Sequence, residues 1–156
     1  MKFHSSVIFV RDIEVSKDFY VGLLHQQVEH DFGKNVILKS GLSLWEIRPE
    51  HIISKKLETA ASSNRFELYF ETDLILEAFQ NLKNAGVRFL HEIHEEPWGQ
   101  RTMRFFDPDN HLVEIGEPLE TFVLNMNDRG LSSEQIAAKS GIPLDTVNEI
   151  LKSNLH

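Results

Sequence analysis

The stretch RFFDPDNHLVEIGEP, residues 104–118, decides the fold. A strand-like run rich in aromatics ends at Asp107-Pro108-Asp109-Asn110, a sequence typical of a turn, and a second apolar run follows. Strand alternation in that second run places one carboxylate, Glu114, on the inward side. A buried carboxylate is costly unless it is paired or coordinated. This hairpin therefore predicts that a group on the inner face of the sheet pairs with Glu114 or coordinates it.

Composition limits the class of protein. The chain has 156 residues, a mass of 18.0 kDa and 41% hydrophobic residues, which suits one domain or one domain with a small appendage. Its net charge of −8 and pI near 5.4 disfavour a broad nucleic-acid or anionic-membrane surface. It has no cysteine, which excludes disulfides and thiolate zinc sites. No stretch approaches the roughly 18 apolar residues of a membrane span, and a cytoplasmic protein is expected.

The pattern of elements occurs twice. FHSSVIFV (3–10) reads as a strand, a helix is expected near 14–25, and VEHDF, VILKS and LSLWEIR read as three further strands. FELYFET (66–72), a helix near 75–85, and VRFLHEI, TMRFFD and HLVEIGE repeat that order. Aligning the two halves by sequence places Glu46 opposite Glu114 and Ser5 opposite Glu67. An internal duplication of a βαβββ unit is the simplest interpretation.

Four motifs carry a resemblance to a known family: FVRDIEVSKDFY, ELYFET, PWGQR and FFDPDNHLVEIGEP. Over residues 1 to about 118 the chain resembles the vicinal oxygen chelate superfamily, which includes glyoxalases, bleomycin-resistance proteins and extradiol dioxygenases. The resemblance implies an α+β fold in which two βαβββ modules, about 1–60 and 61–118, form a curved mixed sheet around a cavity. Residues 119–156 would form a C-terminal helical extension.

The resemblance also implies a metal site. It carries the family's four ligand positions over to Ser5, Glu46, Glu67 and Glu114, of which we expect the three glutamates to hold a divalent ion (Mg, Mn, Ni or Zn). Carboxylate ligands favour hard ions such as Mg²⁺ or Mn²⁺. Ser5 departs from the family's pattern, because a serine hydroxyl is a poor ligand at neutral pH. His4 would point to the opposite side of the strand, and neither it nor the other histidines is assigned as a ligand.

A metal-free alternative explains the same glutamates. Glu46 and Glu114 could instead form ion pairs with Arg48, Arg101 or Arg104. His91 and His94 are expected to be solvated side chains of an edge strand or loop, although a shifted register would turn His94 to the cavity.

Candidate ligand-binding residues surround these carboxylates. Trp98, Gln100 and Arg101 belong to the PWGQR loop, where stacking and hydrogen bonding to a small planar or polar molecule are expected. Trp45 and Tyr69 lie on strands that should line or flank the cavity.

Two functions follow from these residues. The first is a metal-dependent lyase or isomerase, related to lactoylglutathione lyase, that stabilises an enediolate while Glu67 or Glu114 moves the proton. The alternative is a metal-free protein of the bleomycin-resistance type that binds a small molecule. A homodimer is expected in either case, with no membrane partner.

The extension resembles a helix-turn-helix. Ser132 or Ser133 can cap one short helix, Gly141-Ile142-Pro143 ends it, and LDTVNEILKS forms the next. That second helix has Lys152 as its only cation, so we expect packing on the main domain or its dimer mate rather than DNA binding.

Overall fold

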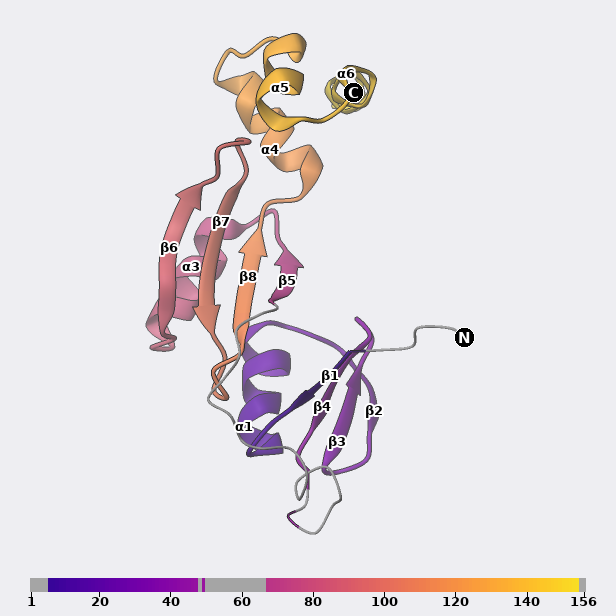
Figure 1. The fold of residues 1–156 in the computed structure, drawn as a ribbon, viewed down its shortest axis with the longest axis vertical. Coiled ribbons are helices and arrows are strands. Elements are labelled where there is room, and N and C mark those ends of the chain that lie inside the picture. The colour runs from indigo at the N-terminus through magenta and orange to yellow at the C-terminus, as the bar shows by residue number, and fades with distance from the viewer. Residues whose placement is uncertain (1–5, 48, 50–66, 155–156) are drawn as a thin grey trace. The chain divides into compact units, whose positions relative to one another are not determined.

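The computed structural model describes residues 6–47, 49 and 67–154. The chain divides into two compact units, residues 1–66 with 106–111 and residues 67–105 with 112–156. Each unit contains one four-stranded mixed sheet, which confirms the predicted α+β fold with two βαβββ modules (Figure 1). His4, Ser5 and Arg48, which entered the sequence predictions, lie outside the described residues.

The first unit has the strand order β1-β4-β3-β2. Its elements are β1 (Ser6–Phe9), α1 (Ile13–Lys17) continued by η1 (Asp18–Leu23), β2 (Val28–Asp31), β3 (Asn35–Leu38) and β4 (Leu42–Trp45). Strand β1 runs parallel to β4, and the other pairs are antiparallel. The Asp12 side chain accepts hydrogen bonds from two backbone amides of the first helical turn and so fixes the start of α1. The helix expected near 14–25 is present.

The second unit repeats this order as β5-β8-β7-β6. Its sheet module comprises β5 (Leu68–Glu71), α3 (Ile75–Asn84), β6 (Phe89–Glu95), β7 (Arg101–Phe106) and β8 (Leu112–Gly116). Helix α3 lies against one face of the sheet (Figure 1). The buried side chains of this unit include Ile75, Phe79, Leu82, Met103, Phe105, Val113 and Ile115. The opposite face carries polar side chains, and the candidate site lies there.

The Asp107-Pro108-Asp109-Asn110 turn forms as predicted and packs within the first unit. Asp107 is 5% exposed, and its Oδ1 accepts the backbone N–H groups of Asp109 and His111. Asn110 adopts φ 72°, a left-handed conformation that asparagine tolerates. The second carboxylate oxygen of Asp107 accepts the Tyr20 hydroxyl at 2.8 Å, and His111 Nδ1 lies 2.8 Å from the same oxygen. This turn is therefore anchored by a buried polar network.

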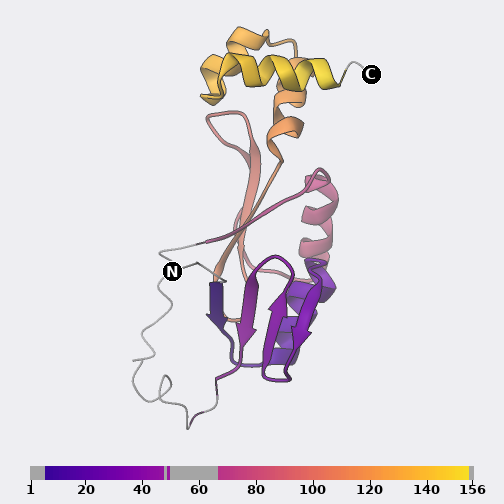
Figure 2. The same ribbon diagram turned by 90° about the vertical axis from the view of Figure 1, so that its right-hand side faces the viewer.

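The C-terminal helices belong to the second unit. They are α4 (Leu119–Asp128), α5 (Ser133–Ser140) and α6 (Leu144–Ser153), seen at the end of the β6–β7 hairpin in Figure 2. Ser132 and Gln135 form a capping box at the start of α5, and Gly141, with φ 75°, ends it. The three helices share a buried core of Phe122, Val123, Met126, Ile136, Val147 and Ile150. Among the described residues, none of the helices has the length and apolarity to cross a bilayer.

Candidate functional site

Arg104 on β7 stands at the centre of three glutamates on the polar face of the second sheet. Its Nε donates to Glu67 Oε2 at 3.1 Å, and its Nη1 donates to Glu96 Oε1 at 2.9 Å. Its Nη2 forms an ion pair with Glu114 Oε2. Glu67 precedes β5, Glu96 follows β6 and Glu114 lies on β8, so the guanidinium joins all the strands of this sheet. We call these four residues the arginine cluster.

Glu114 is the most buried carboxylate of the arginine cluster, at 5% exposure. Burial raises its pKa above the usual value, and Arg104 opposes that rise. The charge of Glu67, a hydrogen bond with it, and the charge of Glu96 add to the increase. In contrast, the hydrogen bond from Arg104 holds the pKa of Glu96 below its usual value. The cluster therefore contains two carboxylates whose pKa values are shifted in opposite directions, Glu96 downward and Glu114 upward.

His91 belongs to the same network. Its Nε2 lies 3.1 Å from Arg104 Nη1, and its Nδ1 lies 2.8 Å from the carbonyl oxygen of Glu92. Because arginine only donates and a carbonyl only accepts, Nε2 must accept and Nδ1 must carry the hydrogen. His91 Nε2 thus joins the acceptors around Arg104.

An irregularity in β6 turns both histidines to this face. His91 pairs with Arg104 and His94 with Thr102, although strand alternation would put residues three apart on opposite sides. The register shifts between them, and their rings lie 6.0 Å apart. The expectation that His91 is simply solvated was therefore wrong, because its ring is bonded to Arg104.

Three of the predicted ligand-binding residues form one chain of hydrogen bonds. Trp98 Nε1 donates to Gln100 Oε1 at 3.0 Å, and Gln100 Nε2 donates to the Tyr69 hydroxyl at 2.9 Å. The Tyr69 hydroxyl in turn donates to Glu71 Oε1 at 3.0 Å. Burial and the bond to Glu71 raise the pKa of Tyr69 to about 12, so the hydroxyl stays protonated at neutral pH. Gln100 is buried, whereas Trp98 and Tyr69 are 38% and 47% exposed and form an accessible aromatic surface.

Gly116 gives these side chains room to lie across β8. A Cβ at this position would stand 2.8 Å from Gln100 Nε2 and 3.0 Å from the Tyr69 hydroxyl oxygen. Both distances are shorter than ordinary contacts, so only glycine permits this arrangement.

Arg101, also predicted to bind ligand, is engaged by Glu117. Its Nε donates to Glu117 Oε1 at 3.0 Å, and its backbone N–H donates to Oε2 at 3.0 Å. Glu117 is 1% exposed and Arg101 is 35% exposed, which makes this a partly buried ion pair. The contacts of Arg101 are those of a residue that holds the PWGQR loop to the end of β8.

In the first unit, Trp45 is the last residue of strand β4, and Glu46 follows it. The Trp45 ring makes an edge contact with Phe9, with 6.0 Å between the ring centroids. Glu46 accepts the Lys34 ammonium at 2.5 Å through one oxygen and the Ile13 backbone N–H at 2.9 Å through the other. Both carboxylate oxygens of Glu46 are therefore bonded within the first module.

The strand register corrects the alignment of the two halves. The helices of the two modules begin at Ile13 and Ile75, so Phe9 corresponds to Glu71. Phe9 pairs with Trp45, and Glu71 pairs with Gly116. Glu46 thus corresponds to Glu117, and the counterpart of Glu114 is Ser43, which is 4% exposed. The repeat argument for Glu46 as a ligand position fails, because sequence similarity between LWEIRPE and VEIGEP is offset by three residues from the true register.

The described residues do not fit a metal ion. Within residues 6–47, 49 and 67–154, no group of three or more histidine, aspartate or glutamate side chains is arranged to hold one. Arg104 occupies the place beside Glu67 and Glu114 that a cation would take. Arg104 supplies part of the compensation that the burial of Glu114 requires, because its charge opposes the rise in pKa that burial causes.

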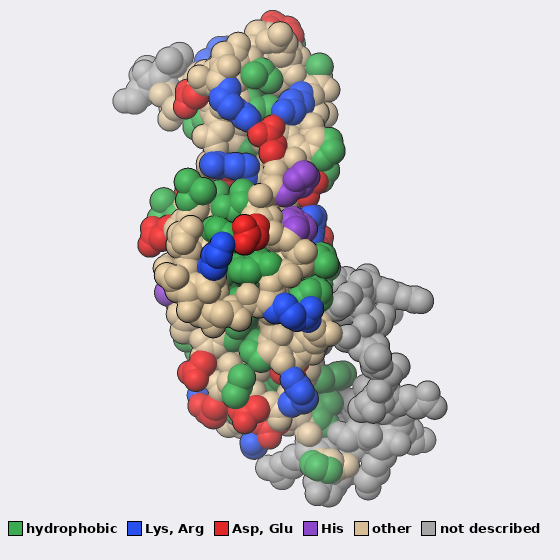
Figure 3. Space-filling view, turned by 90° about the vertical axis from the view of Figure 1, so that its left-hand side faces the viewer, with side chains coloured by type: hydrophobic (Ala, Val, Ile, Leu, Met, Phe, Trp, Pro, Cys, Tyr) green, Lys and Arg blue, Asp and Glu red, His purple; other side chains and the backbone are tan. Residues whose placement is uncertain are grey.

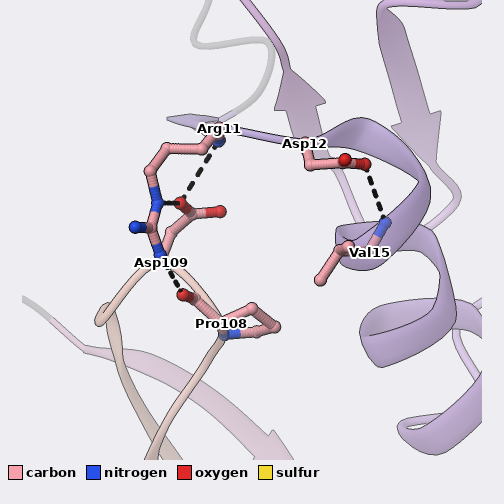
Figure 4. Close-up of a pocket in the computed structure, with 5 residues that line it drawn as sticks. All are labelled: Arg11, Asp12, Val15, Pro108 and Asp109. Atoms are coloured by element: carbon pink, nitrogen blue, oxygen red, sulfur yellow. Dashed lines mark hydrogen bonds and ion pairs between the residues drawn. The ribbon is translucent and has the colours of Figure 1, made fainter.

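A separate depression of about 210 Å³ lies in the first unit, lined by Arg11, Asp12, Val15, Pro108 and Asp109 (Figure 4). Arg11 Nε donates to Asp109 Oδ1 at 2.6 Å and its Nη2 donates to the Pro108 carbonyl at 2.6 Å. These contacts join the end of β1 to the Asp-Pro-Asp-Asn turn. They bind the turn to the first module and involve none of the predicted site residues.

Comparison with known proteins identifies the family of the chain. The model of the glyoxalase-like domain family matches residues 3–120. The chain belongs to this family, and with it to the vicinal oxygen chelate superfamily. The match ends at residue 120, so most of α4 and all of α5 and α6 lie beyond it.

Solved structures agree with the family. A protein of unknown function from Agrobacterium tumefaciens strain C58 is 35% identical, with a TM-score of 0.64, over 76% of this chain and 95% of that one. A lactoylglutathione lyase from A. tumefaciens is 18% identical, with a TM-score of 0.55, over 74% and 92% of the two chains. TioX from Micromonospora sp. ML1 is 14% identical, with a TM-score of 0.57, over 75% and 96%. The last two share the fold alone, and no curated protein matches the chain.

Proposed function

We propose that this glyoxalase-like protein binds a small organic molecule, without a metal ion, on the polar face of its second sheet. The observation that carries the proposal is the position of Arg104, which bonds to Glu67 and Glu96 and pairs with Glu114. The Arg104 guanidinium is thus the cation that pairs with these carboxylates, in place of a metal ion. This supports the metal-free alternative drawn from the sequence over the metal-dependent lyase or isomerase.

The charge of the site favours a particular ligand chemistry. Three carboxylates surround one guanidinium, so the formal charge of the arginine cluster is negative. A ligand with hydrogen-bond donors or a positive charge would complement this face, whereas an anion would be repelled. Trp98 and Tyr69 supply exposed aromatic surface for a planar ligand, next to the polar groups.

A second candidate, proton transfer, rests on Glu114. A buried carboxylate with a raised pKa is a stronger base than an exposed one and is suited to accept a proton from a substrate. The enediolate chemistry predicted from the sequence would use Glu114 in this way, with Glu67 beside it. Its metal ion would have to displace Arg104, and for that reason simple binding is the better supported function.

Matched probes test the ligand class. Benzamidine, benzamide and benzoate share a ring and differ in charge, so thermal-shift and NMR titrations compare cation, neutral donor and anion directly. We expect benzamidine to bind best and benzoate least. Glu67→Gln should weaken benzamidine binding, since it removes an exposed carboxylate of the cluster. Equal binding of the three probes would contradict the proposal.

Metal ions test the competing function. Protein purified without chelator should contain no stoichiometric metal, and Mn²⁺, Ni²⁺, Zn²⁺ or Mg²⁺ should leave its melting temperature unchanged. A cation-induced rise that is abolished in Glu114→Gln would instead favour the metal-dependent reaction, because ligand-linked stabilisation follows ln(1 + [L]/Kd).

The homodimer expected from the sequence remains a prediction. The mass of the purified chain measured by light scattering tests it, and a monomeric mass would contradict it.

A further inference from the structure

The helical extension contacts the loop that carries Trp98 and Gln100, and the first contact is electrostatic. Glu95, the last residue of β6, accepts Arg129 Nη1 at 2.7 Å through one oxygen and Lys139 Nζ at 2.8 Å through the other. Arg129 follows α4, and Lys139 lies in the last turn of α5. One carboxylate at the start of the loop is therefore held by cations associated with two helices.

The second contact is steric and lies at the tip of the loop. Gly99 has φ +99°, and a Cβ built on it would stand 2.5 Å from the sulfur of Met126. Met126 is fully buried in the core of the extension. The loop backbone thus packs directly on α4, at a distance that only glycine allows.

The third contact reaches Gln100 through Glu117. Asn125 on α4 donates to Glu117 Oε1 at 2.8 Å, and Arg101 binds the same carboxylate. The Glu117 carbonyl oxygen accepts Gln100 Nε2 at 2.7 Å, which is the nitrogen that also bonds to Tyr69. Through this one buried residue, α4 is coupled to the amide that orients Trp98.

We propose that the helical extension is a clamp that positions Trp98 and Gln100 for ligand binding, with Glu95 and Asn125 as its positioning residues. This inference rests on the proposed function of the second sheet. All three contacts come from residues 125–139, beyond the end of the family match at residue 120. The clamp is therefore an addition to the glyoxalase-like domain.

The charges of the extension suit this role better than a role on DNA. Two of its cations, Arg129 and Lys139, are both paired with Glu95. Basic and acidic side chains are interspersed over the helices on the face seen in Figure 3. A phosphate-binding surface would instead require cations gathered on one side.

The test measures, in the same variants, hydrogen exchange in the loop of residues 96–101 and the affinity for ligand. Glu95→Gln removes the charge that both cations bind, and Asn125→Ala removes the hydrogen bond to Glu117. Lys139→Arg keeps the ion pair, and Lys152→Ala removes an exposed cation of α6, so both serve as controls. The readouts are amide hydrogen exchange across residues 96–101, exchange of the Trp98 indole N–H by NMR, and benzamidine affinity. Trp45→Phe identifies the Trp98 signal, because the chain has two tryptophans.

We expect Glu95→Gln and Asn125→Ala to speed exchange in the loop about tenfold, with α3 unchanged, because they weaken local rather than global structure. Benzamidine should bind several-fold more weakly to both, and the two controls should match the wild type. Unchanged loop exchange would overturn the clamp, and so would faster exchange with unaltered benzamidine affinity. If benzamidine does not bind the wild type, the proposed ligand class is wrong, and loop exchange alone decides whether the extension holds the loop.

Discussion

Arg104 on β7 and Glu114 on β8 form an ion pair across neighbouring strands, with the Glu114 carboxylate almost fully buried. Replacing Arg104 with methionine keeps the apolar stem and leaves three carboxylates without their cation. Removing one partner of a buried pair costs about 3–5 kcal/mol, so we expect a loss of unfolding free energy in that range by urea denaturation. Arg104→Lys should lose less, because it retains the charge without the fork of donors. A methionine variant as stable as the wild type would show that Arg104 does not compensate Glu114.

Gly116→Ala tests the close approach of Gln100 and Tyr69 to β8. The added methyl group would meet both side chains, and we expect a loss of about 1–3 kcal/mol on chemical denaturation. The Trp98 indole NMR signal should also move, since Gln100 accepts its hydrogen bond. Gly22→Ala is the matched control, because a Cβ there meets nothing within 4 Å. It lies in a helix and should stabilise the protein by up to about 1 kcal/mol.

The pKa of His111 predicts a dependence of stability on pH. Burial lowers this pKa, but the hydrogen bond and charge of Asp107 and the charge of Asp109 outweigh it and raise the pKa overall. A raised histidine pKa stabilises the fold fully below the unfolded value of about 6.5, and this stabilisation disappears as pH rises through the folded pKa. The Tyr20 hydroxyl also donates to Asp107, and Arg11 pairs with Asp109, so both act on the same carboxylates.

His111→Gln keeps a hydrogen-bond donor beside Asp107 and cannot titrate in this range. The melting temperature of the wild type should exceed that of the variant most at pH 6, and the difference should narrow by pH 8. A difference that stays constant over this interval would exclude His111 as the titrating group.

Helices α5 and α6 resemble a helix-turn-helix, but the charges of α6 lead us to expect no DNA binding. Helix α6 has Lys152 as its only cation, together with Asp145 and Glu149. In a mobility-shift assay with random duplex DNA, we expect no complex even at low salt, where counterion release would most favour phosphate contacts. A sequence-selective complex at physiological salt would contradict this and would connect the ligand face to regulation.

The sequence predicted the layout of the modules well, because each module depends on local signals. The apolar spacing of 75–85 located α3, and the Asp-Pro-Asp-Asn turn appeared where its residues indicated. Glu114 was recognised as a buried charge from strand alternation alone. Such features are set by residues near one another in the chain, and periodicity reports them directly.

The centre of the candidate site could not be derived in the same way. The irregularity in β6 reverses the alternation between His91 and His94, and nothing in FLHEIHE marks it. Arg104 was one of three arginines that could have paired with a glutamate, and only the pairing of strands selects it. The three-residue error that placed Glu46 opposite Glu114 has the same origin, because register is fixed by contacts between strands.

Glu46 and Glu117 correspond to each other in the true register, and each forms an ion pair just after its strand. Glu46 pairs with Lys34 in the first module, and Glu117 pairs with Arg101 in the second. Glu46 remains 22% exposed, whereas Glu117 is covered and meets Asn125 of α4. Covering a neutralised pair costs far less desolvation energy than covering a lone carboxylate. Helix α4 therefore buries a carboxylate that Arg101 already neutralises, and Asn125 adds one more hydrogen bond to it.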